Sequence, residues 1–289
     1  MQIRKNLRAL TRATAGIVFL PVAATLAGVQ GLVVGPLTHN DTFIPGMIYG
    51  GLRRIFGYKV IFNKASAPLV QDKPVWFLSN HLSSMDFIPA GVILNGSFVG
   101  KSEISKRPGM APIARALKFI GIERKPEFNA QSRGKIAKNF NAGRNTIMFP
   151  EATTSDDGDV KLFHAGLLTL MFGAAAVDKR NRPVSLEKDV VVQPVAIQIK
   201  SVNGKDAAKD KELRSLYRIN NGSKKISKIW RSLQVKNVTI EVTAFAPLDP
   251  KKFANAQDLA NAAAREVAKV INPGQTTFKK AVIPDRKAS

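Results

Sequence analysis

Short apolar runs alternate with longer amphipathic stretches along the chain beyond residue 57. Strand-like apolar runs cover residues 58–62, 75–78, 97–99, 146–149, 190–199 and 238–246. Helix-like stretches lie near residues 84–94, 109–119, 128–141 and 165–178, and an alanine-rich stretch at 255–271 places Leu259, Ala263, Val267 and Val270 on one helical face. Because strands that alternate with helices pack as layers around a sheet, this pattern predicts an α/β domain.

The first 56 residues follow a different pattern. Residues 13–38 contain no charged side chain, and as one helix they would extend about 39 Å, more than the ~30 Å hydrocarbon core of a bilayer. Glycines and prolines interrupt this stretch, which favours a helical hairpin in the membrane plane over a single crossing, with a buried helix of a soluble protein as a third alternative. Basic residues flank it on both sides and give no orientation: Arg4, Lys5, Arg8 and Arg12 before it, Arg53, Arg54 and Lys59 after it. We therefore expect a membrane-attachment region at 1–56, the α/β domain at 57–272 and a C-terminal tail at 273–289.

The charge balance points to an anionic partner. Lys and Arg number 44 against 21 Asp and Glu, a formal net charge of +23, which suits nucleic acid, an anionic membrane surface or an acidic carrier protein. No helix-turn-helix, zinc or ribonucleoprotein motif accompanies the charge, so we expect no nucleic acid partner. The segment KKISKIWR at 224–231, with Trp230 and nearby Tyr217, suits either an amphipathic membrane-contact helix or a solvated basic face. The absence of cysteine excludes disulfides, zinc–thiolate sites and cysteine nucleophiles.

The run around His81 carries the clearest candidate chemistry. An apolar strand ends at Asn80-His81, and small hydroxyl residues that suit a helix start follow it. Asp86 lies five residues beyond His81, about one helical turn into that helix. Its carboxylate would accept a hydrogen bond from one ring nitrogen of His81 and leave the other nitrogen to take a proton from a hydroxyl group. A histidine–aspartate spacing alone is a weak signal, since it also occurs by chance or for structural reasons.

Three further runs follow in order along the chain. Residues 119–124 end an apolar turn with Arg124; residues 147–155 lead from a strand into a polar loop with Glu151, Thr153 and Thr154; residues 191–197 form an apolar strand that contains Pro194. Taken singly, these runs fit a surface arginine, a turn and an edge strand.

In combination, the four runs resemble the glycerolipid acyltransferase family of the lysophosphatidic acid acyltransferase type, whose blocks are N-H-x-x-x-x-D, an F-I-x-R-like run, F-P-E-G-T-R and a V-x-P-V-like strand. The resemblance covers residues 75–197. It implies a single acyltransferase domain with a mixed central sheet flanked by helices, no metal, and no cofactor beyond acyl-ACP or acyl-CoA as co-substrate. By the same resemblance His81 is the general base, Asp86 orients it, Arg124 binds an acceptor phosphate or other anionic headgroup, and Glu151, with Thr153 beside it, binds the acceptor.

The third block departs from the family at two positions. It has Ala152 where the family has a glycine that adopts a positive φ or approaches the substrate closely, and Thr154 where the family has an arginine. The expected reaction is acyl transfer to the free hydroxyl of a lysolipid, with lysophosphatidic acid the family default. The loop is similar to that of bacterial lyso-ornithine lipid acyltransferases, which makes a lyso-aminolipid the alternative acceptor.

The resemblance also implies partners and a compartment: an anionic membrane surface, an acyl carrier protein or CoA thioester, and the cytoplasmic face of a bacterial inner membrane. A non-catalytic basic membrane-binding protein on the same fold is a remote alternative, against which the intact His81–Asp86 pair argues. His164 is expected to be a structural histidine, although a surface or headgroup contact is an alternative.

Overall fold

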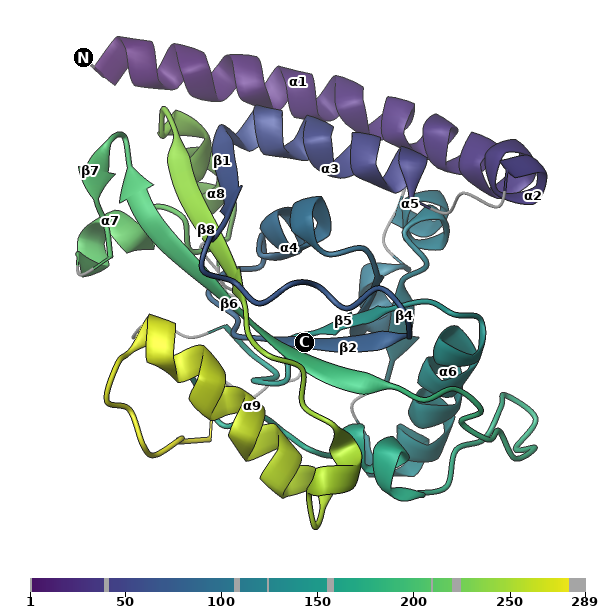
Figure 1. Ribbon diagram of the computed structural model, residues 1–289. Helices are drawn as coiled ribbons and strands as arrows, with labels where there is room; N and C mark the ends of the chain where they lie inside the picture. The colour runs from purple at the N-terminus through teal and green to yellow at the C-terminus, as the bar shows by residue number, and fades with distance from the viewer. Residues whose placement is uncertain are drawn as a thin grey trace.

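A mixed β-sheet forms the centre of the fold (Figure 1). The computed structural model describes residues 2–38, 42–106, 110–123, 125–154, 159–208, 210–219 and 225–280. Within these ranges, eight strands follow the order β1-β8-β6-β2-β5-β3-β4, with β7 paired to β6. Most neighbours are parallel, but β6 and β8 pair antiparallel. The predicted α/β class and mixed sheet are therefore confirmed. The strands are β1 (Tyr58–Phe62), β2 (Val75–Ser79), β3 (Ser97–Lys101), β4 (Ile120–Ile122), β5 (Thr146–Met148), β6 (Val191–Val202), β7 (Lys205–Asp206) and β8 (Val238–Ala244).

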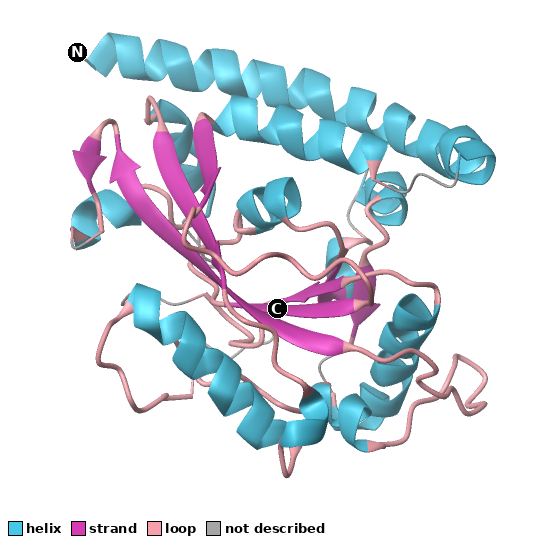
Figure 2. Cartoon of the chain, in the orientation of Figure 1, coloured by secondary structure: helices cyan, strands magenta, loops and turns pink. Residues whose placement is uncertain are grey.

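Helices flank the sheet on both faces (Figure 2). The α-helices of the described residues are α1 (Gln2–Val29), α2 (Gly35–Thr38), α3 (Phe43–Phe56), α4 (Phe87–Ile93), α5 (Met110–Ala116), α6 (Asn129–Asn141), α7 (Lys211–Ser215), α8 (Lys225–Gln234) and α9 (Ala256–Ile271). A π-helical turn spans Gln30–Val34, and short 3-10 helices span Ser102–Ile104, Pro126–Phe128, Leu168–Phe172 and Pro250–Lys252.

Strand β2, which leads to His81, is buried on both faces. Trp76 and Leu78 pack into the core cluster that includes residues of α6 and α9, whereas Val75 and Phe77 pack into the cluster that includes residues of α3 and α4. All four side chains are at most 1% exposed. Because alternate residues of a strand point to opposite faces, a strand covered on both sides needs a continuous apolar run, which is the sequence pattern seen here. The surrounding core thus holds the end of β2, and with it His81, in one position.

Helix α9 forms where the alanine-rich stretch predicted it. The side chain of Asn255 accepts hydrogen bonds from the backbone N–H groups of Gln257 and Asp258, which caps the helix start. The helix packs on β6, with Leu259, Ala263 and Val267 of the predicted face fully buried and Val270 partly buried.

Residues 165–178 do not form the predicted helix. Only the short 3-10 helix Leu168–Phe172 appears there, and it ends at Gly173, whose φ of 78° is left-handed. Leu168 and Leu170 are buried, so the apolar spacing served core packing rather than a long helix. A second difference lies at residues 120–122, where the expected apolar turn is instead the edge strand β4, paired with β3.

Pro194 lies in the interior strand β6, not in an edge strand. Proline has no N–H to donate, so the carbonyl oxygen of Phe245 on the neighbouring chain segment lacks a strand donor at this position. The side-chain amide of Gln193 donates to that oxygen instead, at 3.0 Å, while the N–H of Phe245 donates to the carbonyl oxygen of Pro194. The adjacent glutamine therefore makes the interior proline tolerable.

The N-terminal region forms a helical hairpin that lies against the domain. Helix α1 continues through Pro21 and Gly28, so the expected breaks at these residues are absent, and the helix changes to a π-turn only at Gln30. Helix α3 returns along α1 (Figure 1), with the Phe19 ring against Gly51. The buried side chain of Gln30 accepts a hydrogen bond of 3.3 Å from the N–H of Ile44 in the first turn of α3. This polar residue in the apolar stretch thus stabilises the hairpin.

Two arginines fasten α1 to α8. Arg8 donates to the carbonyl oxygen of Gln234 at 2.8 Å, and Arg12 donates to those of Leu233, Val235 and Lys236. The last carbonyl groups of a helix have no partner within the helix and carry partial negative charge, so a cation there is favourable. Burial lowers the pKa of Arg12, followed in effect by the nearby charge of Arg8. These bonds hold the N-terminal part of α1 on the domain surface.

Candidate active site

His81 and Glu151 follow two neighbouring parallel strands at the same edge of the sheet. Strand β2 leads to Asn80-His81 and β5 leads to Phe149-Pro150-Glu151, and the two strands pair in parallel. The carboxyl ends of parallel strands therefore meet here, where α/β proteins commonly place their sites. Asn80 fixes this edge, because its side chain donates to the carbonyl oxygen of Ile197 and accepts from the N–H of the same residue, at 3.0 and 2.8 Å.

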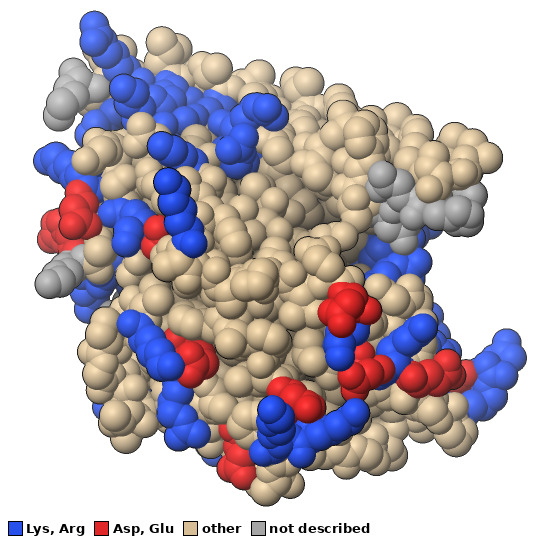
Figure 3. All heavy atoms as spheres, in the orientation of Figure 1, with Lys and Arg blue, Asp and Glu red and all other residues tan. Residues whose placement is uncertain are grey.

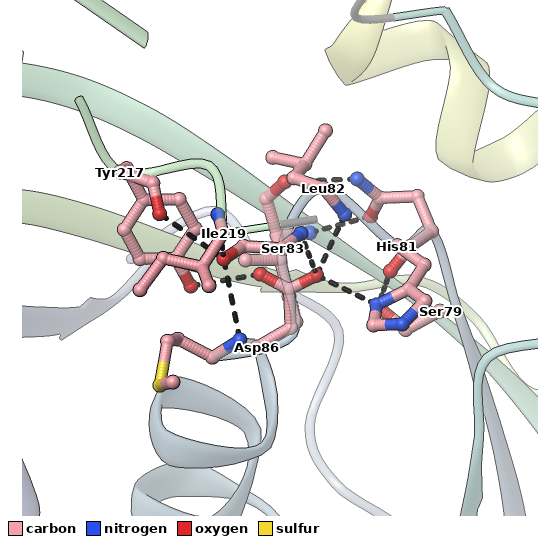
Figure 4. Close-up of polar contacts among 10 residues, drawn as sticks. Ser79, His81, Leu82, Ser83, Asp86, Tyr217 and Ile219 are labelled. Atoms are coloured by element: carbon pink, nitrogen blue, oxygen red, sulfur yellow. Dashed lines mark hydrogen bonds and ion pairs between the residues drawn. The ribbon is translucent and has the colours of Figure 1, made fainter. Parts of the chain in front are cut away.

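The structure brings His81 and Asp86 together as the sequence predicted. Nδ1 of His81 lies 2.9 Å from Oδ2 of Asp86, whose side chain is fully buried, while the histidine side chain is 21% exposed (Figure 4). An ionised carboxylate only accepts hydrogen bonds, so Nδ1 carries the proton that is shared with it. In the neutral imidazole the lone pair is then on Nε2, which makes no hydrogen bond to the described residues. The arrangement leaves a partly exposed nitrogen able to accept a proton.

Backbone amides and an aromatic ring set the orientation of the pair. The N–H groups of Leu82 and Ser83 donate to Oδ2 of Asp86 at 2.6 and 2.8 Å. The imidazole ring stacks on Phe149, with ring centroids 4.5 Å apart and planes 14° apart, so the end of β5 supports the histidine from one side. These contacts limit the rotation of the imidazole ring and of the Asp86 carboxylate.

Sequence reasoning missed Tyr217, which is fully buried and donates from its hydroxyl to Oδ1 of Asp86 at 2.7 Å (Figure 4). The interpretation of Tyr217 as part of a membrane-contact surface is therefore wrong. No spacing signal pointed to this residue, because 131 positions separate it from Asp86. Trp230 and its helix α8 lie on the surface, as that interpretation requires.

Glu151 is fully buried beside the His81–Asp86 pair. Burial raises the pKa of the Glu151 carboxyl well above its ordinary value, and the nearby charge of Asp86 raises it further. The backbone N–H groups of Lys161 and His81 lie close enough to oppose this increase, although no hydrogen bond of good geometry reaches either oxygen from the described residues. A buried carboxylate with so few donors is costly, so burial favours the protonated form of Glu151.

The remaining predicted residues, Thr153, Thr154, Arg124 and His164, differ in their location and burial. Thr153 and Thr154 are partly buried in the loop after Glu151. Arg124 lies outside the described residues. His164 is exposed, and its backbone N–H donates to the carbonyl oxygen of Pro150 at 3.0 Å; its structural role stays a prediction.

Ala152 has a φ of 63°, in the left-handed region, which is one of the two reasons that the resemblance gave for the family's glycine at this position. An alanine there is strained, whereas glycine is not. We expect Ala152→Gly to raise the free energy of unfolding by about 1 kcal/mol, measured by urea unfolding of the purified protein. The control is Ala142→Gly, since Ala142 is exposed with a φ of −79° and should lose about 0.5 kcal/mol. A loss of stability in both variants would show that residue 152 is not strained.

Comparison with known proteins places these residues in a family context. The family described as acyltransferase matches residues 62–198, a stretch that contains all four motifs. The lyso-ornithine lipid O-acyltransferase of Brucella abortus (strain 2308) is 31% identical over 163 residues, which cover 56% of this chain and 57% of that protein. The protein of the same name from Pseudomonas aeruginosa is 27% identical over 135 residues, 47% of each chain. The chain thus spans about half the length of the curated relatives it matches.

A solved structure shows the same fold. The crystal structure of the 1-acyl-sn-glycerophosphate (LPA) acyltransferase PlsC from Thermotoga maritima superposes with a TM-score of 0.65 over 96% of this chain and 99% of that one. Sequence identity between the two is 19%, so this similarity concerns the fold alone.

Proposed function

We propose that the protein is an O-acyltransferase acting on lysolipids, on the premise that residues 62–198, which contain the four motifs, match the acyltransferase family. It moves a fatty acyl group from acyl-ACP or acyl-CoA to a free lysolipid hydroxyl and uses no further cofactor. The observation that carries the proposal is the hydrogen bond of 2.9 Å between His81 and Asp86, which holds Nε2 as a proton acceptor at the carboxyl edge of the sheet.

The proposed reaction needs one base and no enzyme nucleophile. Nε2 of His81 takes the proton of the acceptor hydroxyl as its oxygen attacks the carbonyl carbon of the thioester. The tetrahedral oxyanion collapses, the carbon–sulfur bond breaks, and the imidazolium returns the proton to the departing thiolate. Asp86 stabilises the imidazolium that forms between the two proton transfers, since a buried negative charge lies against Nδ1. One ester forms for each thioester broken.

For the acceptor, two observations favour a lyso-aminolipid over lysophosphatidic acid. The curated relatives are named lyso-ornithine lipid O-acyltransferases. Thr154 also stands where the family has an arginine, so one charge-assisted contact to a phosphate monoester is missing. Lysophosphatidic acid remains the alternative acceptor.

Acyl transfer by the purified protein tests the proposal. Lyso-ornithine lipid and lysophosphatidic acid are offered side by side, each with acyl-CoA and with acyl-ACP. We expect turnover of lyso-ornithine lipid, and we expect Thr154→Arg to increase the turnover of lysophosphatidic acid relative to it. Turnover of lysophosphatidic acid alone would overturn the acceptor assignment, and activity on neither lipid would overturn the function.

We further propose that the protein lies on the cytoplasmic face of a bacterial inner membrane, where acyl-ACP and acyl-CoA are found. The helical segment Gln2–Val34 is long and apolar enough to cross a bilayer. However, α1 contacts α3, α5 and α8 along the domain, and a helix that crossed the membrane would have to leave these contacts. Lys and Arg gather around the N-terminal end of α1, whereas its other end is uncharged in this view (Figure 3). A helix lying in the plane of an anionic surface fits both features.

Helix α8 is expected to contact the same surface. Ile226 and Trp230, one helical turn apart, are 85% and 38% exposed, and α8 packs against α1. The other tryptophan, Trp76, is fully buried, so a change in fluorescence on binding reports on Trp230. With vesicles of anionic phospholipid we expect a blue shift of the emission that declines with added salt, and a roughly tenfold weaker affinity for Ile226→Ser.

The control for this measurement is Phe62→Ser, because Phe62 is as exposed as Trp230 but lies on β1. This variant should bind vesicles as the unchanged protein does. Equal affinities for all three proteins, or emission that vesicles do not alter, would show that α8 stays in water.

A further inference from the structure

The segment Tyr217–Ile219 is bound to the loop between His81 and Asp86 by several hydrogen bonds (Figure 4). Ser83 is the centre of this contact: its hydroxyl donates to the carbonyl oxygen of Tyr217 at 3.1 Å and accepts from the N–H of Ile219 at 3.0 Å. The N–H of Ser84 donates to the carbonyl oxygen of Ile219 at 2.9 Å. The backbone around Tyr217 is therefore held in register with the catalytic loop, and the tyrosine hydroxyl meets Oδ1 of Asp86 as part of the same contact.

The Tyr217 hydroxyl is a permanent donor to this carboxylate. Burial raises the pKa of Tyr217 well above its ordinary value, and the charge of Asp86 raises it further, so the hydroxyl keeps its proton at any pH at which the protein works. Asp86 then accepts one bond at Oδ1 and three at Oδ2, from His81, Leu82 and Ser83. Among the described residues, Tyr217 is therefore the only hydrogen-bond donor to Oδ1, whereas Oδ2 accepts from three donors.

We infer that Tyr217 is a positioning residue that sets the orientation and the charge distribution of Asp86, and through it the basicity of His81. Rotation of a carboxylate about its last bond has only a broad preference, so a donor on Oδ1 limits the tilt of the carboxylate plane that the hydrogen bonds at Oδ2 leave open. Donation to Oδ1 also draws negative charge away from Oδ2, which weakens the stabilisation of the imidazolium. This inference rests on the proposed acyl transfer.

Tyr217→Phe tests the inference, with Tyr58→Phe as the matched control. Both rings are fully or nearly fully buried and pack on each other, with centroids 5.3 Å apart, but the Tyr58 hydroxyl makes no hydrogen bond to Asp86. In Tyr217→Phe we expect kcat/KM at neutral pH to fall about 10-fold to 100-fold, with the KM of the acceptor unchanged. The acidic limb of the pH–rate profile should move to higher pH. Without the Tyr217 hydroxyl, more negative charge lies on Oδ2 of Asp86, and this charge holds the proton on the imidazole more firmly. Tyr58→Phe should change neither quantity.

A purely structural role for Tyr217 predicts a different result. It would lower the stability of Tyr217→Phe and leave the shape of the pH–rate profile unchanged. Incorporation of 3-fluorotyrosine at position 217 keeps the hydroxyl and makes it a stronger donor, so it should move the acidic limb in the opposite direction and remains informative if Tyr217→Phe does not fold. The inference would be overturned if the acidic limb of the pH–rate profile stayed in place both in Tyr217→Phe and in the 3-fluorotyrosine protein.

Proton NMR separates this inference from the function on which it rests. The Nδ1–H proton that His81 shares with Asp86 should give a downfield resonance, identified by its loss in His81→Gln. We expect Tyr217→Phe to shift this resonance and Tyr58→Phe to leave it in place. If the unchanged protein is inactive on every lysolipid but the resonance behaves in this way, the proposed function fails and the coupling between Tyr217 and Asp86 stands. A resonance that does not respond to Tyr217→Phe overturns the coupling itself.

Discussion

Replacement of His81 by alanine is expected to lower the rate of acyl transfer by about 10²–10⁴-fold or more. The variant removes the group that takes the proton of the acceptor hydroxyl, and the neighbouring Glu151 does not replace it, because burial raises the pKa of that carboxyl well above its ordinary value and so favours its protonated form. The loss should appear in kcat, measured with saturating acceptor and acyl donor, while the KM of the lysolipid changes little.

The fold should survive this change. The His81 side chain is partly exposed and, among the described residues, its only hydrogen bond is to Asp86, so its removal leaves one buried oxygen with two backbone donors. His164→Ala is the matched control, since that side chain is exposed. It should keep activity within about twofold, as expected for a surface position. If His81→Ala turns over lysolipid at the rate of His164→Ala, the assignment of the base is wrong.

Asp86→Asn is expected to have the second largest effect, a loss of about 10²–10⁴-fold in kcat. Asparagine fills the same space and its oxygen still accepts from the N–H groups of Leu82 and Ser83. It carries no charge, however, so nothing stabilises the imidazolium that His81 becomes during the reaction. The Tyr217 hydroxyl also loses its anionic acceptor, which costs about 1–3 kcal/mol of stability in a buried site.

A surface carboxylate, Asp189, provides the control for Asp86→Asn. Asp189 pairs with Lys73 and Lys251 and is 55% exposed, so Asp189→Asn should retain full activity and lose at most about 1 kcal/mol in urea unfolding. Because His81 and Asp86 act as one unit, the double variant should be no slower than His81→Ala alone. Multiplicative losses in the double variant would mean that Asp86 acts independently of the histidine.

Much of the fold and part of the site could be predicted from the sequence, because they depend on residues that are close together in the chain. Strands β2 and β6 are covered on both faces, so their apolar runs stand out, and Asn255 caps α9 through contacts within three residues. His81 and Asp86 lie five positions apart, within reach of each other once a strand leads into a helix. The left-handed backbone at Ala152 was one of two explanations that the resemblance to the family offered for a glycine at this position, the other being close approach of the substrate.

Other features were decided by the path of the chain through space. Residues 165–178 have helical spacing, but Gly173 ends a short 3-10 helix there because Leu168 and Leu170 are drawn into the core. Helix α1 passes through Pro21 without a break because contacts with α3, α5 and α8 hold it on the domain. In both cases tertiary packing outweighed the local preference of the residues.

The sequence by itself determined that an α/β domain carries a histidine and an aspartate side by side at a strand end, because neighbours along the chain create that pair. Only the tertiary structure decided what surrounds the pair. Tyr217 reaches Asp86 across 131 positions, and Glu151 loses all contact with water through the elements packed around it. Contacts of this kind depend on elements that are distant in the chain but adjacent in space, so no spacing or periodicity in the sequence encodes them in a readable form.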